Sequence, residues 1–353
     1  MSPRVLVVGG GPSGLATAIC AARRGMTVQL VEPRTGVIDK ACGEGLMPAG
    51  VHALARLGVD PEPLGRPFRG IRYTDGTHHA EADFHDGPGL GIRRLTLHDA
   101  LRAAAEAAGV ERIDGRVDRV EQEEQSVTAH LRDGGALTSD WLFAADGLHS
   151  TIRRALGLEL PPVRPKRIGI RRHFRVQPWS NFVEVHWRPE VEAYVTPVGD
   201  NLVGVAMLVT GELPSAQGQP PFERLLDGFD ALKERLQDAP VASTARGAGP
   251  FEARVARRVA GRVLLVGDAA GYLDPLTGEG LKLGFLGAEA AVDAVARGTP
   301  QHWERAWRRI TRRYYWGTLG LLVLTSQPTL RQWMVPVAAR APWLMGGALR
   351  FLG

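Results

Sequence analysis

The sequence has little cysteine, little lysine and no long apolar run. Its 353 residues include two cysteines, Cys20 and Cys42, with no C-x-x-C pair, and ten histidines without metal-ligand spacing. We therefore expect no disulfide framework, no metal site and a reducing, cytoplasmic location. No stretch reaches the ~18 uninterrupted apolar residues of a membrane-spanning helix. The apolar run at residues 5–8 is too short for a signal peptide and ends in three glycines.

Charge is close to balanced, with 43 basic and 38 acidic residues and a formal net charge of +5. Almost all of the basic residues are arginine, and there is no basic run with interleaved aromatics, so we expect no nucleic-acid partner. A composition of 44% hydrophobic and 23% charged residues is typical of a soluble globular protein. The length predicts roughly two domains.

The order of the predicted elements indicates an α/β domain interrupted by an antiparallel sheet. Residues 4–8 and 27–31 are predicted strands that flank a predicted helix at residues 15–24, which makes a βαβ unit. Residues 166–210 alternate apolar and polar side chains with a period of two, which predicts antiparallel strands. We expect a discontinuous Rossmann-like domain at residues 1–75, 90–160 and 250–300, an inserted β-sheet substrate domain at residues 76–89 and 161–249, and a helical C-terminal tail at residues 301–353.

A glycine-rich turn follows the first predicted strand. The residues from Gly9 to Gly14 read G-G-G-P-S-G and fit the G-x-G-x-x-G pattern. The first glycine permits a tight turn, the second leaves room for a pyrophosphate, and the third lets helix and strand pack closely. The helix N-terminus offers free N–H groups to the phosphates, and Glu32, at the end of the second strand, is placed to bind a ribose. This pattern predicts one bound dinucleotide and leaves NAD and FAD open.

Two later segments resemble the flavoprotein monooxygenases of the p-hydroxybenzoate hydroxylase superfamily. Residues 146–153 read D-G-L-H-S-T-I-R, similar to that superfamily's D-G-x-x-S-x-x-R segment, and residues 267–280 are similar to its second FAD motif. The resemblance implies the p-hydroxybenzoate hydroxylase fold and FAD as the cofactor, with Asp268 at the ribityl chain and Arg94 beside the FAD. The helix after residue 280 would aim its N-terminus at the flavin ring and stabilise the reduced anion.

The expected cofactor-binding residues come from these segments and their neighbours. They are Gly9, Gly11, Pro12, Ser13, Gly14, Glu32, Arg34, Cys42, Gly43, Arg94, Val117, Asp146, Gly147, Gly267, Asp268, Pro275, Gly278, Glu279, Gly280 and Leu281. Glu279 equally suits a plain first-turn carboxylate of the helix that follows it. There is no second dinucleotide fingerprint, so NAD(P)H is expected as a transient reductant, or a partner flavin reductase delivers the reduced flavin.

Residues 40–46 resemble the geranylgeranyl-reductase-like group of the superfamily. They read K-A-C-G-E-G-L, close to that group's K-x-C-G-G-G, with Glu44 in place of a glycine. The group's Y-x-W-x-F-P strand corresponds to residues 194–197, which keep the tyrosine and the proline but lack the tryptophan. Cys42, Glu44 and Tyr194 are the candidate catalytic residues. A buried apolar role for Cys42 and core packing for Tyr194 are the alternatives.

The complete D-G-x-x-S-x-x-R segment favours an FAD-dependent monooxygenase. It would hydroxylate or epoxidise a hydrophobic small molecule with O₂ through a flavin C4a-hydroperoxide. The alternatives are an FAD-dependent reductase of isoprenoid double bonds and a flavin-dependent halogenase. The reductase requires an apolar tunnel, which the apolar tail is suited to line. Helices that cover the core are the simpler interpretation of this tail, and peripheral membrane contact is the alternative.

Overall fold

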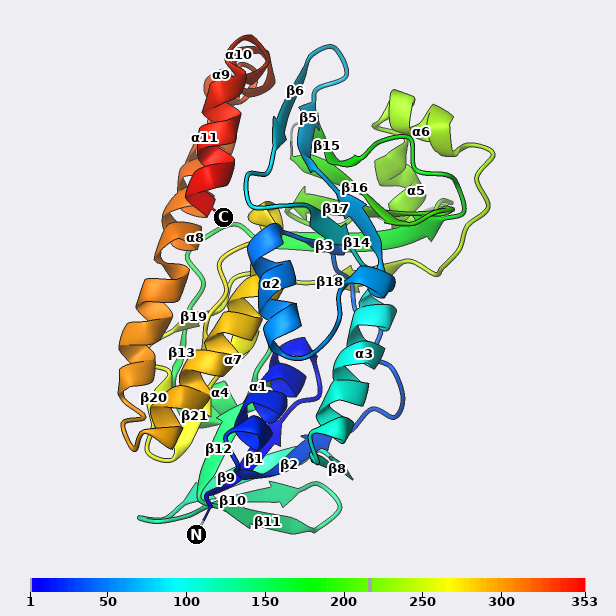
Figure 1. Ribbon diagram of the computed structural model, residues 1–353. Coiled ribbons are helices and arrows are strands. Elements are labelled where there is room, and N and C mark those ends of the chain that lie inside the picture. Colours follow the sequence, from blue (N-terminus) through cyan, green and yellow to red (C-terminus); the bar gives the residue numbers. More distant parts are fainter. Residues whose placement is uncertain (1, 189, 215–217, 353) are drawn as a thin grey trace.

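The computed structural model describes residues 2–188, 190–214 and 218–352 (Figure 1). Its central sheet has six strands, and β1 (Arg4–Val8) lies inside it, paired in parallel with β2 (Thr27–Glu32) and β12 (Trp141–Ala144). Four consecutive apolar residues of β1 are buried, as a strand covered on both faces requires. The strand order is β20 (Val259–Ala260), β21 (Val263–Leu265), β12 (Trp141–Ala144), β1 (Arg4–Val8), β2 (Thr27–Glu32) and β8 (Glu111–Asp114).

Helices from distant parts of the chain pack on this sheet. α1 (Pro12–Arg23) contacts both α3 (Arg94–Ala107) and α7 (Gly280–Ala296), and its alanines allow the close approach. A small antiparallel sheet adds buried Val127 and Ala129 to the same core. Its strands are β9 (Val117–Gln122), β10 (Val127–Leu131) and β11 (Ala136–Ser139).

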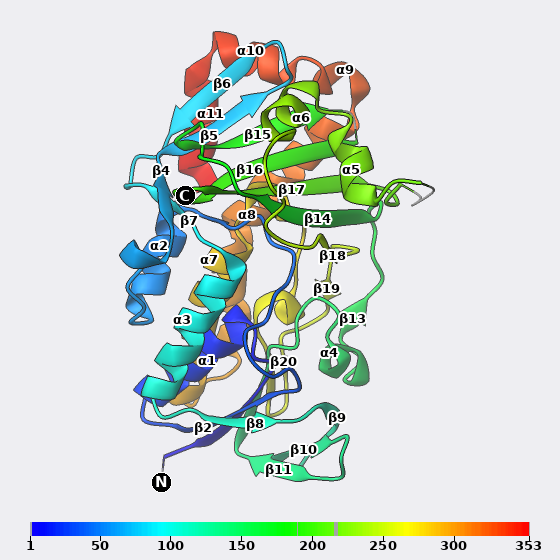
Figure 2. The same ribbon diagram turned by 90° about the vertical axis from the view of Figure 1, so that its right-hand side faces the viewer.

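The inserted sheet lies above the central sheet in Figure 2. Its seven strands are mostly antiparallel, which confirms the expected fold class. One face packs on α5 (Pro221–Leu226) and α6 (Asp230–Leu236) through Phe222 and Leu232. The strand order is β18 (Arg246–Ala248), β14 (Arg167–Phe174), β17 (Leu202–Thr210), β16 (Val191–Gly199), β15 (Phe182–Arg188), β5 (Gly70–Thr74) and β6 (His79–Asp83).

The structure places one segment of the insert differently from the sequence-based expectation. β5 pairs in parallel with β15, so residues 70–74 belong to the inserted sheet rather than to the nucleotide-binding part. The parallel pairing joins strands that are more than a hundred residues apart, and no local pattern reveals it. The remaining elements are α2 (Pro48–Arg56), α4 (Thr151–Ala155), the strands β3 (Gly45–Leu46), β4 (Arg66–Phe68), β7 (Gly89–Gly91), β13 (Glu159–Leu160) and β19 (Arg254–Val255), and the 3₁₀ turns Glu62–Leu64, Gly267–Ala270 and Pro275–Thr277.

The C-terminal tail is helical and reaches the inserted sheet. α8 (His302–Ser326) packs along α7, and the chain then turns back through α9 (Pro328–Arg331), α10 (Met334–Arg340) and α11 (Pro342–Leu352). Both α10 and α11 contact β6, and α11 also contacts α8. Among the helices described, none combines the length and the apolar character that crossing a membrane requires. The tail thus forms an outer wall beside the inserted sheet (Figure 1).

Candidate functional site

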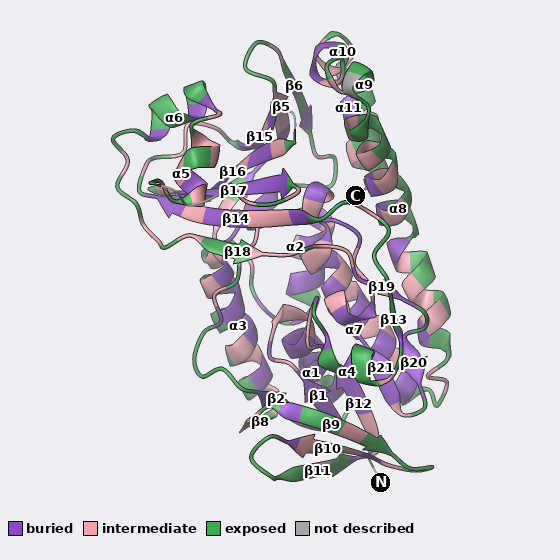
Figure 3. Ribbon diagram, turned by 180° about the vertical axis from the view of Figure 1, so that it is seen from behind, coloured by how far each residue is buried: buried purple, intermediate pink, exposed green. Residues whose placement is uncertain are grey.

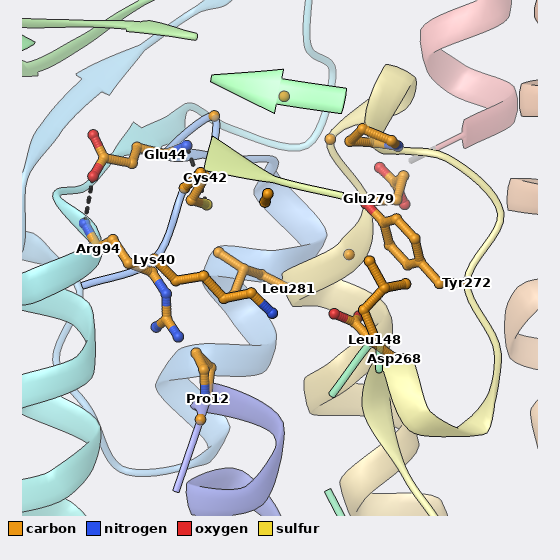
Figure 4. Close-up of a pocket in the computed structure, with 18 of the residues that line it drawn as sticks. Pro12, Lys40, Cys42, Glu44, Arg94, Leu148, Asp268, Tyr272, Glu279 and Leu281 are labelled. Carbon is orange, nitrogen blue, oxygen red and sulfur yellow. Dashed lines mark hydrogen bonds between the residues drawn. The ribbon is translucent and has the colours of Figure 1, made fainter. Parts of the chain in front are cut away.

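A cavity of about 1090 Å³ is lined by both sheets. Its floor contains the carboxyl ends of β1 and β2 and the first residues of α1 and α7, where ligands of parallel α/β sheets bind. Its roof contains side chains of the inserted sheet. Leu321 of α8 and Leu349 of α11 line it as well. Figure 4 shows Cys42, Arg94 and Asp268 arranged around this space.

The glycine turn of the floor has the geometry that its pattern predicts. Gly9 has a φ of +106°, and a Cβ added there would lie 2.4 Å from the carbonyl oxygen of Ala145. A Cβ on Gly14 would lie 1.8 Å from the carbonyl oxygen of Gly9. Neither position has room for a side chain. By contrast, a Cβ on Gly11 would meet no atom within 4 Å, so the space in front of the turn is free.

Glu32 joins this turn to the end of β2. Its carboxylate accepts hydrogen bonds from the Gly10 N–H at 2.8 Å and from Arg34, whose Nε lies 2.7 Å away. Burial alone would raise the pKa of Glu32, but the hydrogen bonds from Arg34 and Gly10 outweigh it and lower the pKa. Glu32 is therefore an anion at the edge of the cavity, as a ribose-binding acid must be.

His98 supports the turn from behind and was not among the predicted site residues. Its Nε2 lies 2.8 Å from the Gly10 carbonyl oxygen, and its Nδ1 accepts from the Ile38 N–H at 3.3 Å. Burial lowers the pKa of His98, so the ring is neutral and donates through Nε2. Its position four residues after Arg94, which puts both side chains on one face of α3, could have predicted His98 as a site residue.

The polar groups of the floor fit a dinucleotide. The N-terminus of α1 has no side-chain cap and no acidic residue in its first turn, so its N–H groups and partial positive charge face the cavity. Within the described part of the chain, Arg94 NH1 and Asp146 Oδ1 are buried without a hydrogen-bond partner, and both residues line the cavity. A buried donor and a buried acceptor of this kind are satisfied when a polar ligand occupies the space.

The predicted site residues come together in the structure. Each residue expected to bind the cofactor or to act in catalysis lines the cavity, with two exceptions. Gly14 and Gly267 lie behind the surface and allow close packing: a Cβ on Gly267 would lie 2.5 Å from Ser13 Oγ. Lys40, which was not among the predicted site residues, also lines the cavity (Figure 4).

Glu44 occupies a glycine-like backbone position and holds the loop that carries Cys42. Its φ is +60°, in the left-handed region that favours the glycine of the resembling pattern. The carboxylate is almost fully buried and accepts a hydrogen bond from the Arg94 N–H at 2.8 Å (Figure 4). It also lies 2.5 Å from His173 Nε2 on β14. Arg171 Nε lies 4.0 Å from it. Both of its oxygens are engaged, so we interpret Glu44 as an anchor of the loop rather than as an acid or base.

Burial raises the pKa of two other residues that line the cavity, Cys42 and Glu279. Burial, and then the charge of Glu44, raise the pKa of the Cys42 thiol, so it stays protonated at neutral pH and is a poor nucleophile. Glu279 precedes the first residue of α7 and forms an ion pair with Lys282. Burial raises the pKa of Glu279, and Lys282 opposes that shift.

Tyr194 lines the cavity in front of a buried polar cluster. Arg167 forms ion pairs with Glu192 at 2.7 Å and with Asp274 at 2.8 Å. One guanidinium thus faces two buried carboxylates, and burial raises the pKa of both acids despite Arg167. The Tyr194 hydroxyl lies 2.5 Å from Glu192 Oε2 and 3.2 Å from the Leu276 carbonyl oxygen. It has one hydrogen for two acceptors, so the cluster is suited to hold a proton on Glu192.

Arg167, Glu192 and Asp274 were not among the predicted site residues. Glu192 and Tyr194 are two apart on β16 and therefore share a face, which was the available signal. Asp274 directly precedes the Pro275 of the second FAD motif. The ion pairs themselves join residues from three separate segments, which only the packing brings together.

The fold and the floor of the cavity define a protein that binds a dinucleotide. Comparison with known proteins agrees: residues 3–296 match the family model for an FAD binding domain, and the chain belongs to that family. The expected FAD-binding function and the broader assignment, an FAD-dependent oxidoreductase, are therefore confirmed.

The relatives and structural neighbours add detail. The chain is 29% identical to a menaquinone reductase of Mycolicibacterium smegmatis, over 99% of this chain and 91% of that protein. It is 27% identical to a digeranylgeranylglycerophospholipid reductase of Methanothrix thermoacetophila, over 86% of this chain and 82% of that protein. A flavoprotein/dehydrogenase from Cytophaga hutchinsonii superposes with a TM-score of 0.86 at 17% identity, covering 99% of this chain and 93% of that one. A flavin-dependent brominase superposes with a TM-score of 0.84 at 18% identity, covering 100% of this chain and 93% of that one. At such identities the structural likeness shows the fold alone.

Proposed function

We propose that the protein is an FAD-dependent reductase that saturates a carbon–carbon double bond of an isoprenoid chain. This reverses the order of the sequence-based preference, which placed a monooxygenase first and such a reductase second. The names of the relatives support the change, since one reduces menaquinone and another a digeranylgeranyl lipid. Both compounds carry long isoprenoid chains.

The apolar lining of the roof is the observation that carries the proposal. A reductase of isoprenoids needs an apolar tunnel beside its cofactor, and the tail was the expected source of one wall. Leu321 and Leu349 of the tail line the cavity opposite the cofactor floor. The roof adds further apolar side chains from the inserted sheet, among them Ile71, Val183, Val185, Met207 and Leu208.

The chain supplies the second hydrogen of the reaction. Reduction of an alkene breaks its π bond and forms two C–H bonds, one from a hydride and one from a proton. Bound FAD supplies the hydride after reduction by NAD(P)H or by a partner flavin reductase. Tyr194 donates the proton from its cavity-facing position, and Glu192 behind it returns a proton to the phenol. Burial raises the pKa of both groups, which favours the protonated form of each.

An anaerobic product analysis tests the proposal. The FAD-loaded protein, reduced with dithionite, is mixed with a geranylgeranyl lipid in detergent, and the products are analysed by mass spectrometry. We expect a mass gain of two hydrogens per reduced bond, without oxygen. A product that gains one oxygen atom, and forms only in the presence of O₂ and NAD(P)H, would return the monooxygenase to first place.

A further inference from the structure

Most of the exposed large hydrophobic side chains among the described residues belong to the C-terminal tail. In the described part of the chain, nine of the thirteen exposed large hydrophobic side chains lie between residues 316 and 351. Three are tryptophans, and Trp316 and Trp343 are 67% and 71% exposed. We call this set the C-terminal apolar face; it consists of Trp316, Val323, Leu324, Leu330, Trp333, Val337, Trp343, Leu344 and Phe351.

These helices are apolar on their inner side as well. Val335 and Met345 are buried in a cluster with Ala80, Ala82 and Trp187 of the inserted sheet. A helix that packs one apolar face on the core normally exposes a polar one. α11 instead presents Trp343, Leu344 and Phe351 outward, and Figure 3 shows exposed residues along the tail helices. These outward-facing side chains therefore indicate a contact with an apolar environment outside the protein.

The positive charge of the tail indicates what this environment is. Residues 301–353 contain eight arginines and one glutamate, a net charge of +7, although the whole chain carries +5. The exposed side of α8 starts with five arginines, between residues 305 and 313, and continues with Trp316, Val323 and Leu324. The one acid, Glu304, accepts hydrogen bonds from the Arg258 and Val259 N–H groups. Basic and aromatic residues on one apolar surface are typical of contact with anionic lipid.

The cavity reaches the same helices. Leu321 of α8 and Leu349 and Arg350 of α11 line its wall, while their neighbours Val323, Leu324 and Phe351 belong to the C-terminal apolar face. The tail therefore separates the cavity from the surface that faces outward. A hydrophobic molecule that leaves a lipid phase at this surface has a short route to the roof of the cavity.

We propose that the C-terminal apolar face docks on a membrane surface that contains anionic lipid, and that the substrate enters the cavity from the bilayer past α8 and α11. The entry route rests on the proposed function, whereas the docking does not. A second copy of this chain is a poorer occupant, because two tails that each carry a net charge of +7 repel one another.

Vesicle sedimentation tests the docking without substrate or turnover. The FAD-loaded full chain is mixed with vesicles of phosphatidylcholine alone or with phosphatidylglycerol. We expect binding to the anionic vesicles that weakens with salt. Trp343→Glu should weaken it at least about tenfold, and each of Arg331→Gln and Arg340→Gln about fivefold. Val241→Glu, at a 55% exposed position outside the tail, is the matched control and should bind like the wild type.

Three results would overturn the docking. They are no binding by the wild type, equal loss in Val241→Glu and Trp343→Glu, and a lipid-free dimer that Trp343→Glu dissociates. The two proposals fail separately. A protein that binds vesicles but reduces no isoprenoid keeps the docking and loses the function. A protein that reduces a detergent-dispersed substrate but binds no vesicles keeps the proposed function and loses the docking.

Discussion

The floor of the cavity is shaped by backbone at glycine positions, whereas its roof is held by buried charged side chains. At the floor, Gly9 and Gly14 lie so close to neighbouring carbonyl groups that no side chain fits. At the roof, Glu44 contacts His173, and Arg167 contacts Glu192 and Asp274, all of them buried. At the floor, we expect an added side chain to destabilise the protein. At the roof, we expect the loss of one of these charged side chains to destabilise it.

The largest effect is expected at the floor. Gly14→Ala places a methyl group 1.8 Å from a backbone oxygen and should destabilise the protein by about 3 kcal/mol. Gly11→Ala meets no protein atom, so the cofactor-free variant should unfold like the wild type. The same methyl group occupies the cofactor space and should weaken FAD binding at least about thirtyfold. Thermal unfolding and flavin titration measure both. Undiminished FAD affinity in Gly11→Ala would place the cofactor elsewhere.

The next effect concerns Glu44, which anchors the loop that carries Cys42 to His173 of the roof. Glu44→Ala leaves His173 and Arg171 buried without this carboxylate and should cost about 3 kcal/mol. Glu44→Gly loses the same carboxylate but relieves the positive φ, so it should be about 1 kcal/mol more stable than the alanine variant. Urea unfolding compares the two. Equal stabilities would show that the backbone at position 44 is not strained.

The third effect is on catalysis and follows from the proposed function. Tyr194→Phe keeps the ring but removes the hydroxyl that donates the proton, so kcat should fall about a hundredfold while KM changes little. Glu192→Gln should shift the pH dependence of kcat, because it removes the acid behind the phenol. Steady-state reduction assays measure both, with FAD content as the control. An unchanged kcat in Tyr194→Phe would remove Tyr194 from proton transfer.

The smallest effect is on the pH dependence of stability, in which Glu184 and Glu192 of the inserted sheet should act in opposite directions. Burial alone would raise the pKa of Glu184, but hydrogen bonds from His186 and Trp179 and the charge of Arg72 lower it to about 2. A depressed pKa stabilises the fold above the unfolded value, and this stability is lost as the pH falls towards 2. Glu184→Gln should cost about 2 kcal/mol at neutral pH, with the difference vanishing in acid. A difference that persists at pH 2 would contradict the shift.

The raised pKa of Glu192 has the opposite consequence. The folded state retains this proton above the pKa of the unfolded chain, so Glu192 makes stability fall as the pH rises from about 4.5. Glu192→Gln should flatten that part of the stability curve, whereas Glu184→Gln should leave it in place. The comparison is made by urea unfolding across the pH range.

Much of the floor was predictable from the sequence. The turn at residues 9–14, Glu32, and the segments at 146–153 and 267–280 were assigned to one site, and the structure gathers them around one cavity. Their signals lie within a few residues of each other and act through backbone conformation, which neighbouring residues determine. The parallel pairing of β5 with β15 left no such signal, and it moved residues 70–74 into the inserted sheet.

The sequence by itself determined the nucleotide-binding turn, the family and the apolar, arginine-rich character of the tail. The tertiary structure alone decided that His173 meets Glu44 and that Arg167 pairs with both Glu192 and Asp274. It also decided that Leu349 lines the same cavity as Gly9. The physical reason is that a buried ion pair or an apolar wall depends on which strands and helices become neighbours, and that choice is made by the packing of the whole chain.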